Sequence, residues 1–304
     1  QKDEVIEHTD FQGDSLELAR KIPHLDAENI VFCGVDFMAE TAAILAQKDQ
    51  NIFLPDISAS CVMANMAPAY LVTTVISKLS ETGKKIIPLA YVNSSASIKA
   101  LCGKYGGSVC TSANARTMLN WALEQGDQVL FLPDSHLAIN TSHQLGLTDS
   151  QYQVLDIRQN GNNLKTSTQD SARLLIWPGV CAVHACFKIK HIETVRKTDL
   201  QARIVVHPEC HPDVVQAADA TGSTSFIIKY AQNLPQGIDL YIGTESNLVY
   251  RLAKRHQGEK NIFPLHISYC SNMGKTTQAN LANLLKNLKT AQPIRVPGEI
   301  SEKS

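Results

Sequence analysis

The chain repeats one short pattern three times: an apolar run, a proline and, a few residues later, a cysteine. The runs are residues 51–55, 174–178 and 261–264, and the cysteines are Cys61, Cys181 and Cys270. A short apolar run that ends at a turn residue is typical of a buried strand. In a parallel sheet, functional loops follow the carboxyl ends of the strands. The pattern therefore predicts an α/β fold in which three thiols come together.

A longer repeat surrounds each cysteine pattern. Residues 86–92 and 203–206 are expected to form strands, and each leads through a turn into a helix. Strand-to-helix segments at Gly34, Pro133 and Gly243 follow in the same order, at spacings of 99 and 110 residues. Alternating strands and helices predict parallel sheets that are covered by helices and joined by right-handed crossovers.

We therefore predict three homologous three-layer αβα units, with short parallel sheets arranged around a pseudo-threefold axis. Their expected bounds are 1–85, 86–190 and 191–304, the last with a C-terminal tail. The polar segment 148–171 is expected to be a surface insertion in the second unit. The first unit lacks its opening strand, so we expect the chain to be a fragment whose parent carries that strand just before Gln1.

Composition and charge argue against several classes of protein. The 304 residues are 44% hydrophobic and 19% charged, and the net charge of −1 gives no support for a nucleic-acid or anionic-membrane partner. No apolar run approaches the roughly 18 residues that suggest a membrane span, and no signal peptide is visible in the given residues. We therefore expect a cytoplasmic protein whose eight cysteines are thiols or metal ligands and not disulfides.

Three thiols in matched positions point to a metal site. A single buried cysteine usually acts as a small hydrophobic residue, and that is the alternative interpretation for each of the three. Three thiolates without a fourth fit either an iron–sulfur cluster with one open iron or a catalytic zinc. Five cysteines that do not share the pattern are expected in the core or in helices: Cys33, Cys102, Cys110, Cys186 and Cys210.

Three turns rich in small polar residues each open an expected helix. They are residues 13–15, 111–114 and 222–225. Serine, threonine, asparagine and aspartate in such turns satisfy free amides as N-caps. A helix N-terminus also attracts anions, so three of them facing one cavity would suit a phosphate or several carboxylates. Both interpretations can hold together.

Polar side chains follow the expected strands beside these turns. They are Tyr91, Asn93, His184, His207 and Glu209. An isolated histidine or glutamate at the end of a strand is more often a solvated loop residue. The equivalent positions of these residues, beside the expected anion sites, favour acid–base work instead. Glu245 and Asp36 could share that work or be structural caps, and the sequence leaves this open.

Together these segments resemble the quinolinate synthases, the iron–sulfur enzymes of de novo NAD biosynthesis. The matching segments are GDSLELAR, GVDFMAE, PDISASCVMA, YVNSS, CTSAN, LPDSHL, WPGVCAVH, HPEC, GST, IGTE and the one around Cys270. They cover nearly the whole chain in the family's order. Two features depart from the family's pattern: Cys270 lacks the CxxC partner that some members have, and Gln1 matches only the last residue of a His-x-Tyr-Gln motif.

The resemblance implies three homologous αβα domains around a pseudo-threefold axis and one 4Fe–4S cluster held by Cys61, Cys181 and Cys270. It implies an enzyme that condenses iminoaspartate with dihydroxyacetone phosphate to quinolinate, with loss of phosphate and water. The open iron would act as a Lewis acid, without net electron transfer. The resemblance also leaves open a partnership with the aspartate-oxidising enzyme that supplies iminoaspartate.

The resemblance further implies which residues form the site. The catalytic residues would be Tyr91, His184, His207 and Glu209. The substrate-binding residues would be Ser15, Asn93, Ser112, Ser223 and Thr224. Two other functions stay open as alternatives: an iron–sulfur sensor or scaffold without turnover, and a zinc-binding structural protein.

Overall fold

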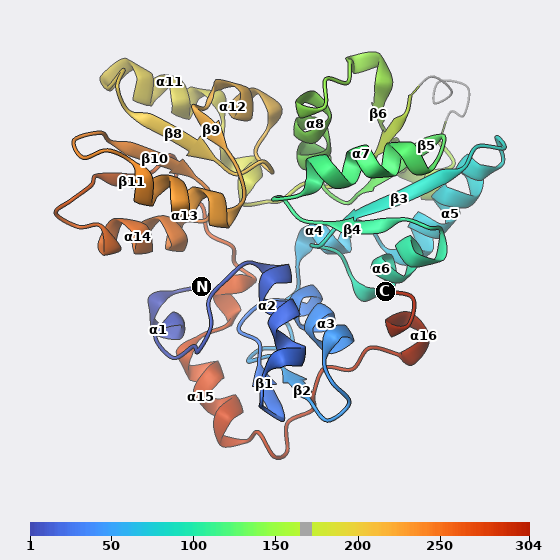
Figure 1. The fold of residues 1–304 in the computed structure, drawn as a ribbon, viewed down its shortest axis with the longest axis horizontal. Coiled ribbons are helices and arrows are strands. Elements are labelled where there is room, and N and C mark those ends of the chain that lie inside the picture. The colour runs from blue at the N-terminus through green and yellow to red at the C-terminus, as the bar shows by residue number, and fades with distance from the viewer. Residues whose placement is uncertain (165–171) are drawn as a thin grey trace.

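The computed structural model describes residues 1–164 and 172–304, and its strands form three separate parallel sheets (Figure 1). Every strand pairing within these sheets is parallel, and helices surround each sheet. The predicted α/β class with short parallel sheets is therefore confirmed. Among the described residues, no helix is both long enough and apolar enough to cross a lipid bilayer.

The first sheet consists of β1 (Asn29–Val31) and β2 (Asn51–Phe53). α3 (Asp36–Leu45) connects the two strands, and α2 (Ser15–Lys21) packs against α3. The buried side chains between these elements are Ile22, Phe32, Ala39, Ala42, Ile52 and Leu54. Because the sheet has only two strands, its core is small, and much of its support comes from the neighbouring helices.

The second sheet is the largest, with the strand order β4-β3-β5-β7-β6. Its strands are β3 (Ile86–Tyr91), β4 (Ser108–Cys110), β5 (Gln128–Leu132), β6 (Tyr152–Val154) and β7 (Leu174–Ile176). All residues of β3, β5 and β7 are buried. Burial on both faces explains why these strands read as continuous apolar runs.

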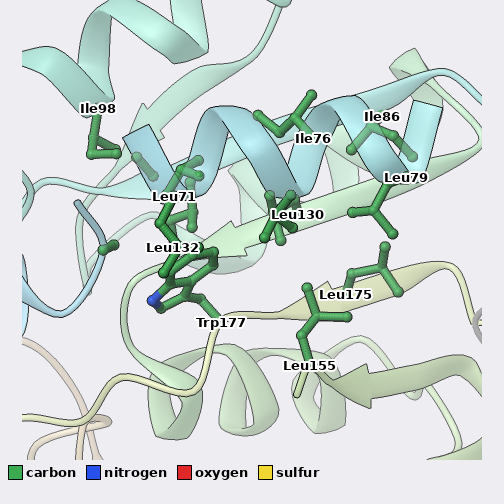
Figure 2. Close-up of a cluster of buried hydrophobic side chains, with 14 of the residues drawn as sticks. Leu71, Ile76, Leu79, Ile86, Ile98, Leu130, Leu132, Leu155, Leu175 and Trp177 are labelled. Carbon is green, nitrogen blue, oxygen red and sulfur yellow. The ribbon is translucent and has the colours of Figure 1, made fainter. Parts of the chain in front are cut away.

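Helices cover both faces of the second sheet. α5 (Ala69–Ser80) and α6 (Ala96–Lys104) pack on one face, and α7 (Ala115–Gln125) and α8 (Ser135–Gln144) pack on the other. Figure 2 shows the first of these two cores, where the side chains of α5 lie over those of β5 and β7 and over Trp177. This core holds the strand that leads to Cys181 in place.

The third sheet has the strand order β9-β8-β10-β11. Its strands are β8 (Arg203–Val206), β9 (Ala220–Thr221), β10 (Leu240–Gly243) and β11 (Ile262–Pro264). On one face lie α11 (Ile189–Thr198) and α12 (Pro212–Ala217), and on the other lie α13 (Thr224–Asn233) and α14 (Ser246–Arg255). The expected strands at 86–92 and 203–206 are thus confirmed as β3 and β8, and both lie inside their sheets.

The prediction of a surface insertion at 148–171 is wrong for part of that segment. Tyr152–Val154 form β6, which pairs with β7 and becomes the edge strand of the second sheet. α9 (Arg158–Gly161) follows and contacts α5. The three residues of β6 are too few, and too polar, to stand out as a strand in the sequence. The rest of the segment, residues 165–171, lies outside the described residues.

The chain after Cys270 leaves the third sheet and packs against the first. Lys275 Nζ donates to Ser58 O at 2.7 Å, and α15 (Gln278–Lys286) contacts α1 (Asp3–Ile6). α16 (Gly298–Ser301) then contacts α6 of the second sheet, and Figure 1 shows this red segment running below the blue elements. The expected third unit therefore includes a tail that crosses to the other two.

Candidate active site

A cavity of about 1170 Å³ is bounded by loops that follow strands of all three sheets. Ten of the residues that the sequence predicted for the site line it: Ser15, Cys61, Tyr91, Asn93, Cys181, His184, His207, Glu209, Thr224 and Cys270. Ser112 and Ser223 are not among its lining residues. Residues far apart in the sequence can therefore contact one bound molecule.

The three cysteine loops share two backbone hydrogen bonds. The carbonyl of each cysteine accepts an amide four residues on: Asn65 N to Cys61 O (3.1 Å), Ala185 N to Cys181 O (2.9 Å) and Gly274 N to Cys270 O (3.0 Å). The carbonyl two residues before each cysteine accepts an amide from the loop of the adjacent strand: Asp36 N to Ala59 O (2.8 Å), Ser135 N to Gly179 O (2.8 Å) and Ser246 N to Ser268 O (2.9 Å). The same local geometry therefore presents each thiol.

Two side chains tie these loops to the rest of the fold. Asp36 Oδ1 accepts hydrogen bonds from Cys61 N at 3.2 Å and from Phe37 N at 2.7 Å. Trp177, which is fully buried, donates from Nε1 to Met66 O at 2.8 Å. The second bond joins the strand before Cys181 to the segment after Cys61. Asp36 thus has the structural role that the sequence left open.

The three thiols of the site form no disulfide. Burial raises the pKa of Cys61 to about 12. Burial and the nearby charge of Glu209 raise the pKa of Cys181 well above its usual value. A metal bound here must displace these protons. Cys270 Sγ accepts a hydrogen bond from Met273 N at 3.5 Å, a contact of the kind that tunes sulfur ligands of iron–sulfur clusters.

Glu209 is the centre of a buried hydrogen-bond network. Tyr91 Oη donates to Glu209 Oε1 at 2.7 Å, and His184 Nδ1 lies 3.2 Å from Glu209 Oε2. Burial by itself raises the pKa of this carboxyl group, but the adjacent imidazole of His184 and the hydrogen bonds from His184 and Tyr91 lower it on balance. Burial and the charge of Glu209 in turn raise the pKa of Tyr91. Glu209 is thus a carboxylate beside the protonated phenol of Tyr91.

Two stacked histidines complete the network. The rings of His184 and His207 have centroids 4.5 Å apart and an interplanar angle of 18°. Burial and the proximity of His184 lower the pKa of His207 to about 3, so its ring is neutral near pH 7. Its Nδ1 accepts the Glu209 amide at 3.3 Å, which assigns the ring proton to Nε2. His184 Nε2 lies 3.1 Å from Thr244 Oγ1.

One group of side chains at this network could hold a metal ion. Ligand atoms of Cys181, His184 and Glu209 lie within 4.8 Å of one another, and His184 Nδ1 is 3.2 Å from Cys181 Sγ. Glu209 and His184 already bond to each other, to Tyr91 and to Thr244. Cys181 is therefore the member of the group that is most free to bind a metal.

The predicted anion-binding turns differ in their geometry. Ser15 and Thr224 are the first residues of α2 and α13, and both line the cavity. Ser223 Oγ accepts the amide of Phe226 at 3.3 Å, so this residue is an N-cap. Ser112 lies in the turn before α7, whose N-cap is Asn114. The capping interpretation therefore describes the turn at Ser223, whereas Asn114 Oδ1 accepts the amide of Thr111 at 2.7 Å and does not bond to an amide of α7.

The remaining residues singled out from the sequence are also placed. Glu245 Oε2 accepts Asn247 N at 3.0 Å and caps α14, so its structural role is confirmed although it also lines the cavity. Cys102, Cys110 and Cys210 are buried as expected, and Cys186 lies in a short 3-10 helix but is exposed. The prediction is wrong for Cys33, which is not in the core or a helix but lines the cavity.

Sequence reasoning overlooked two residues that matter here, Asp14 and Thr244. Asp14 lines the cavity and caps α2, yet the turn at 13–15 contributed only Ser15 to the predicted site. Thr244 bonds to His184 from the loop after β10. Its signal was its place in the third strand-to-helix segment, directly after Gly243.

Comparison with known proteins identifies this arrangement. The family model described as "NadA: Quinolinate synthetase A protein" matches residues 1–304. The chain belongs to this family. It is 44% identical over 295 aligned positions to the quinolinate synthase of Streptomyces coelicolor, covering 95% of this chain and 75% of that protein. It is 43% identical over 309 positions to the quinolinate synthase of Anoxybacillus flavithermus, covering 99% and 84%. The resemblance found in the sequence is therefore confirmed: the chain is an enzyme, a quinolinate synthase of NAD biosynthesis.

Proposed function

We propose that this enzyme condenses iminoaspartate with dihydroxyacetone phosphate in the cavity described above, releasing phosphate and water to give quinolinate. The observation that carries this proposal is the meeting of three matched thiols with the Glu209 network at one cavity. Both substrates and the product are anions. The cavity offers them hydroxyl groups at Ser15 and Thr224 and an amide at Asn93.

Cys61, Cys181 and Cys270 would hold a 4Fe–4S cluster through three of its irons. The chemistry of the donor set fits: three free thiols lie on loops with the same hydrogen bonds, and the other nearby donors are engaged with one another. When bound, such a cluster supplies one open iron as a Lewis acid for substrate oxygen. Three thiols also distinguish this site from a structural zinc site, which is closed by four ligands.

The Glu209 network would move protons during the condensation. Glu209 is held as a carboxylate, so it can accept a proton from a substrate carbon through the hydroxyl of Tyr91, 2.7 Å away. His207, neutral and protonated on Nε2, can donate a hydrogen bond to a substrate oxygen. His184 orients Glu209 from the opposite side, and Thr244 holds His184.

Substrate binding would use the residues at the helix starts. Ser15, Asn93 and Thr224 face the cavity and can bind carboxylates or phosphate directly. Ser223 supports Thr224 by capping the same helix, α13. Ser112 precedes α7 and would act only if the second cavity beside it, lined by Thr111 and Asn114, takes part in binding.

The three sheets would be related by a pseudo-threefold axis through the cavity, in units of 1–85, 86–190 and 191–304. The matched hydrogen bonds at the three cysteine loops support this arrangement. So does the shared strand order, in which β3 and β8 each lie between the next two strands of their units. An aspartate-oxidising enzyme would supply the iminoaspartate, because an imine hydrolyses in water.

One anaerobic experiment tests the proposal. The protein is reconstituted with iron and sulfide, and we expect about four of each per chain, with broad visible absorption that is lost in air. We then expect quinolinate to form from dihydroxyacetone phosphate and iminoaspartate generated in situ. A full cluster without product would favour the sensor or scaffold alternative. Tight zinc binding with no cluster would favour the structural alternative.

A further inference from the structure

Asp14 lies between two cavities of the protein. It lies at the N-terminus of α2, where its Oδ1 accepts the amide of Ser15 at 2.8 Å. It lines the main cavity, which also contains Glu209 and Tyr91, and it lines a second cavity of about 570 Å³. Leu16, two residues on, packs on the same cluster as Tyr91, Cys61 and Cys181. Asp14 thus borders both the reaction site and a separate water-accessible space.

We propose that Asp14 is the general acid of the reaction, which protonates the oxygen that leaves as water. This inference rests on the proposed function and adds a catalytic residue to it. The main cavity then carries two carboxyl groups with opposite tasks: Glu209 accepts protons and Asp14 donates them. Enzymes separate such tasks by giving the two groups different surroundings.

The surroundings of the two carboxyl groups differ: those of Glu209 favour the carboxylate, and those of Asp14 favour the protonated acid. Glu209 has Tyr91 and His184 as hydrogen-bond partners on its carboxylate oxygens. Asp14 has the single amide of Ser15, and no ion pair of the described residues includes it. Burial raises the pKa of Asp14, and although the amide of Ser15 opposes this, the charges of Glu209 and Glu17 raise it further.

The other charged groups around Asp14 do not cancel this effect. Glu17 lies one turn along α2 and pairs with Lys21 at 3.5 Å, so that cation is already engaged. Arg20 and His24 line the second cavity, away from Glu209. Tyr91 donates a hydrogen bond to Glu209, so it belongs to the pair of groups that accepts protons.

The proposed step is balanced in protons and electrons. The Glu209–Tyr91 pair removes a proton from a substrate carbon, and the carbon–hydrogen electron pair becomes a new double bond. The adjacent carbon–oxygen bond breaks, its electron pair stays on oxygen, and Asp14 gives that oxygen its proton, so that water leaves. The Asp14 carboxylate regains a proton from water in the second cavity, and Glu209 releases its own to solvent, so the net change is loss of water.

The decisive variant is Asp14→Asn. Asparagine is as good an N-cap as aspartate and can accept the same Ser15 amide, so the start of α2 is preserved while the acid is removed. We expect kcat to fall about 10²–10³-fold, as is typical for loss of a general acid. Iron content and the visible absorption of the loaded protein should not change. The wild-type rate should fall as the pH rises through the raised pKa of Asp14, and this limb should vanish in the variant.

The matched control is Glu17→Gln, on the same helix and lining both cavities. Its loss of charge should leave kcat nearly intact and move the falling limb to lower pH, because the charge of Glu17 raises the pKa of Asp14. A falling limb of the wild-type pH profile that persists unchanged in Asp14→Asn would refute the proposal by itself, as would an Asp14→Asn enzyme with near-normal kcat. Asp14→Ser, which also caps the helix, gives a second test should Asp14→Asn fold poorly. Wild-type protein that forms no quinolinate would refute the proposed function instead.

Discussion

At the residue scale, one buried carboxylate organises the site. Glu209 is 2% exposed, and a carboxylate in such a position is stable only when its oxygens are hydrogen-bonded. Tyr91 satisfies one oxygen and His184 the other. The cost of burial is thereby offset, and a reactive base is kept in place without solvent.

Tyr91→Phe tests this base. The change removes the hydroxyl that bonds Glu209 at 2.7 Å but keeps the ring in its buried position. We expect kcat to fall about 10²–10³-fold, because proton transfer to and from substrate is lost. Iron content should stay at the wild-type level. Steady-state assays of quinolinate formation measure the loss.

Tyr152→Phe is the matched control. Tyr152 also donates its hydroxyl to a carboxylate, Asp149 Oδ1 at 2.9 Å, but it lies at the edge of the second sheet, away from the cavity. Its loss should leave kcat unchanged. A Tyr91→Phe enzyme as active as Tyr152→Phe would contradict the role given to Tyr91.

His207 makes the metal-free protein sensitive to acid. Its pKa is about 3 in the folded protein and near 6.5 when unfolded, so between these values the unfolded state binds more protons. Stability therefore rises with pH in this window and is lost as the pH falls through it. At pH 5 the protein should therefore be about 2 kcal/mol less stable than near neutral pH, since one pKa unit corresponds to about 1.4 kcal/mol.

Urea unfolding of the metal-free protein at pH 5 and pH 7.5 measures this effect of His207 on the free energy of unfolding. The stability difference between the two pH values should be smaller in His207→Gln than in the wild type. His24→Gln, at an exposed position, should keep the wild-type difference. An equal pH dependence in all three proteins would show that His207 is not buried in its neutral form.

At the element scale, the sequence predicts buried strands and the loops after them better than it predicts edge strands and helix caps. The apolar strands that precede Cys181 and follow Lys85 were predictable, because burial on both faces leaves a continuous apolar run. β6 was missed because a partly exposed edge strand needs no such run. The hydrogen-bond partners of Glu209 could not be predicted, because they join loops more than 20 residues apart through the fold.

Cys181→Ser tests the cysteine loops. The hydroxyl of serine is a poor iron ligand beside the thiolates of the other two loops, so most iron and the visible absorption should be lost. The variant should fold, because the loop is held by backbone bonds from Ala185 N and Ser135 N. Iron and sulfide analysis after anaerobic reconstitution provides the measurement.

Cys186→Ser is the nearest control. Cys186 lies five residues further on in the same segment, is exposed and does not line the main cavity. The cluster should therefore form normally in the Cys186→Ser variant. Because Cys61 and Cys181 are protonated in the metal-free protein, cluster assembly should also weaken as the pH is lowered. A cluster that survives in Cys181→Ser would overturn the assignment of ligands.

At the scale of the whole molecule, the C-terminal segment links the three sheets. It leaves the third sheet after Cys270, and Ile294 N then donates to Ile52 O at 2.7 Å on the first. Ser304 Oγ finally donates to Ala96 O at 3.1 Å at the start of α6. The expected unit of 191–304 did not include this path, because a polar tail carries no periodic pattern that says where it packs.

Gly103 is the point at which this tail comes closest to α6. A Cβ atom on Gly103 would lie 1.9 Å from Lys303 O, far inside contact distance and against backbone that cannot rotate away. Gly103→Ala should therefore displace α16 from α6. Global stability should change little, because alanine inside a helix is favoured over glycine by up to about 1 kcal/mol and offsets the lost contacts. The expected signature is local: faster amide exchange and proteolysis at residues 298–304, with the cluster and the Glu209 network intact.

Gly298→Ala separates this effect from a general change in the tail. Gly298 opens α16, and a Cβ there meets no atom within 4 Å. Alanine at this position should keep or increase the protection of the segment. Because the two substitutions add the same methyl group, opposite effects on exchange would show that the close approach of Gly103 to Lys303 anchors the tail. Equal protection in both variants would mean that α16 is held by other contacts, such as the bond from Ser304 to Ala96.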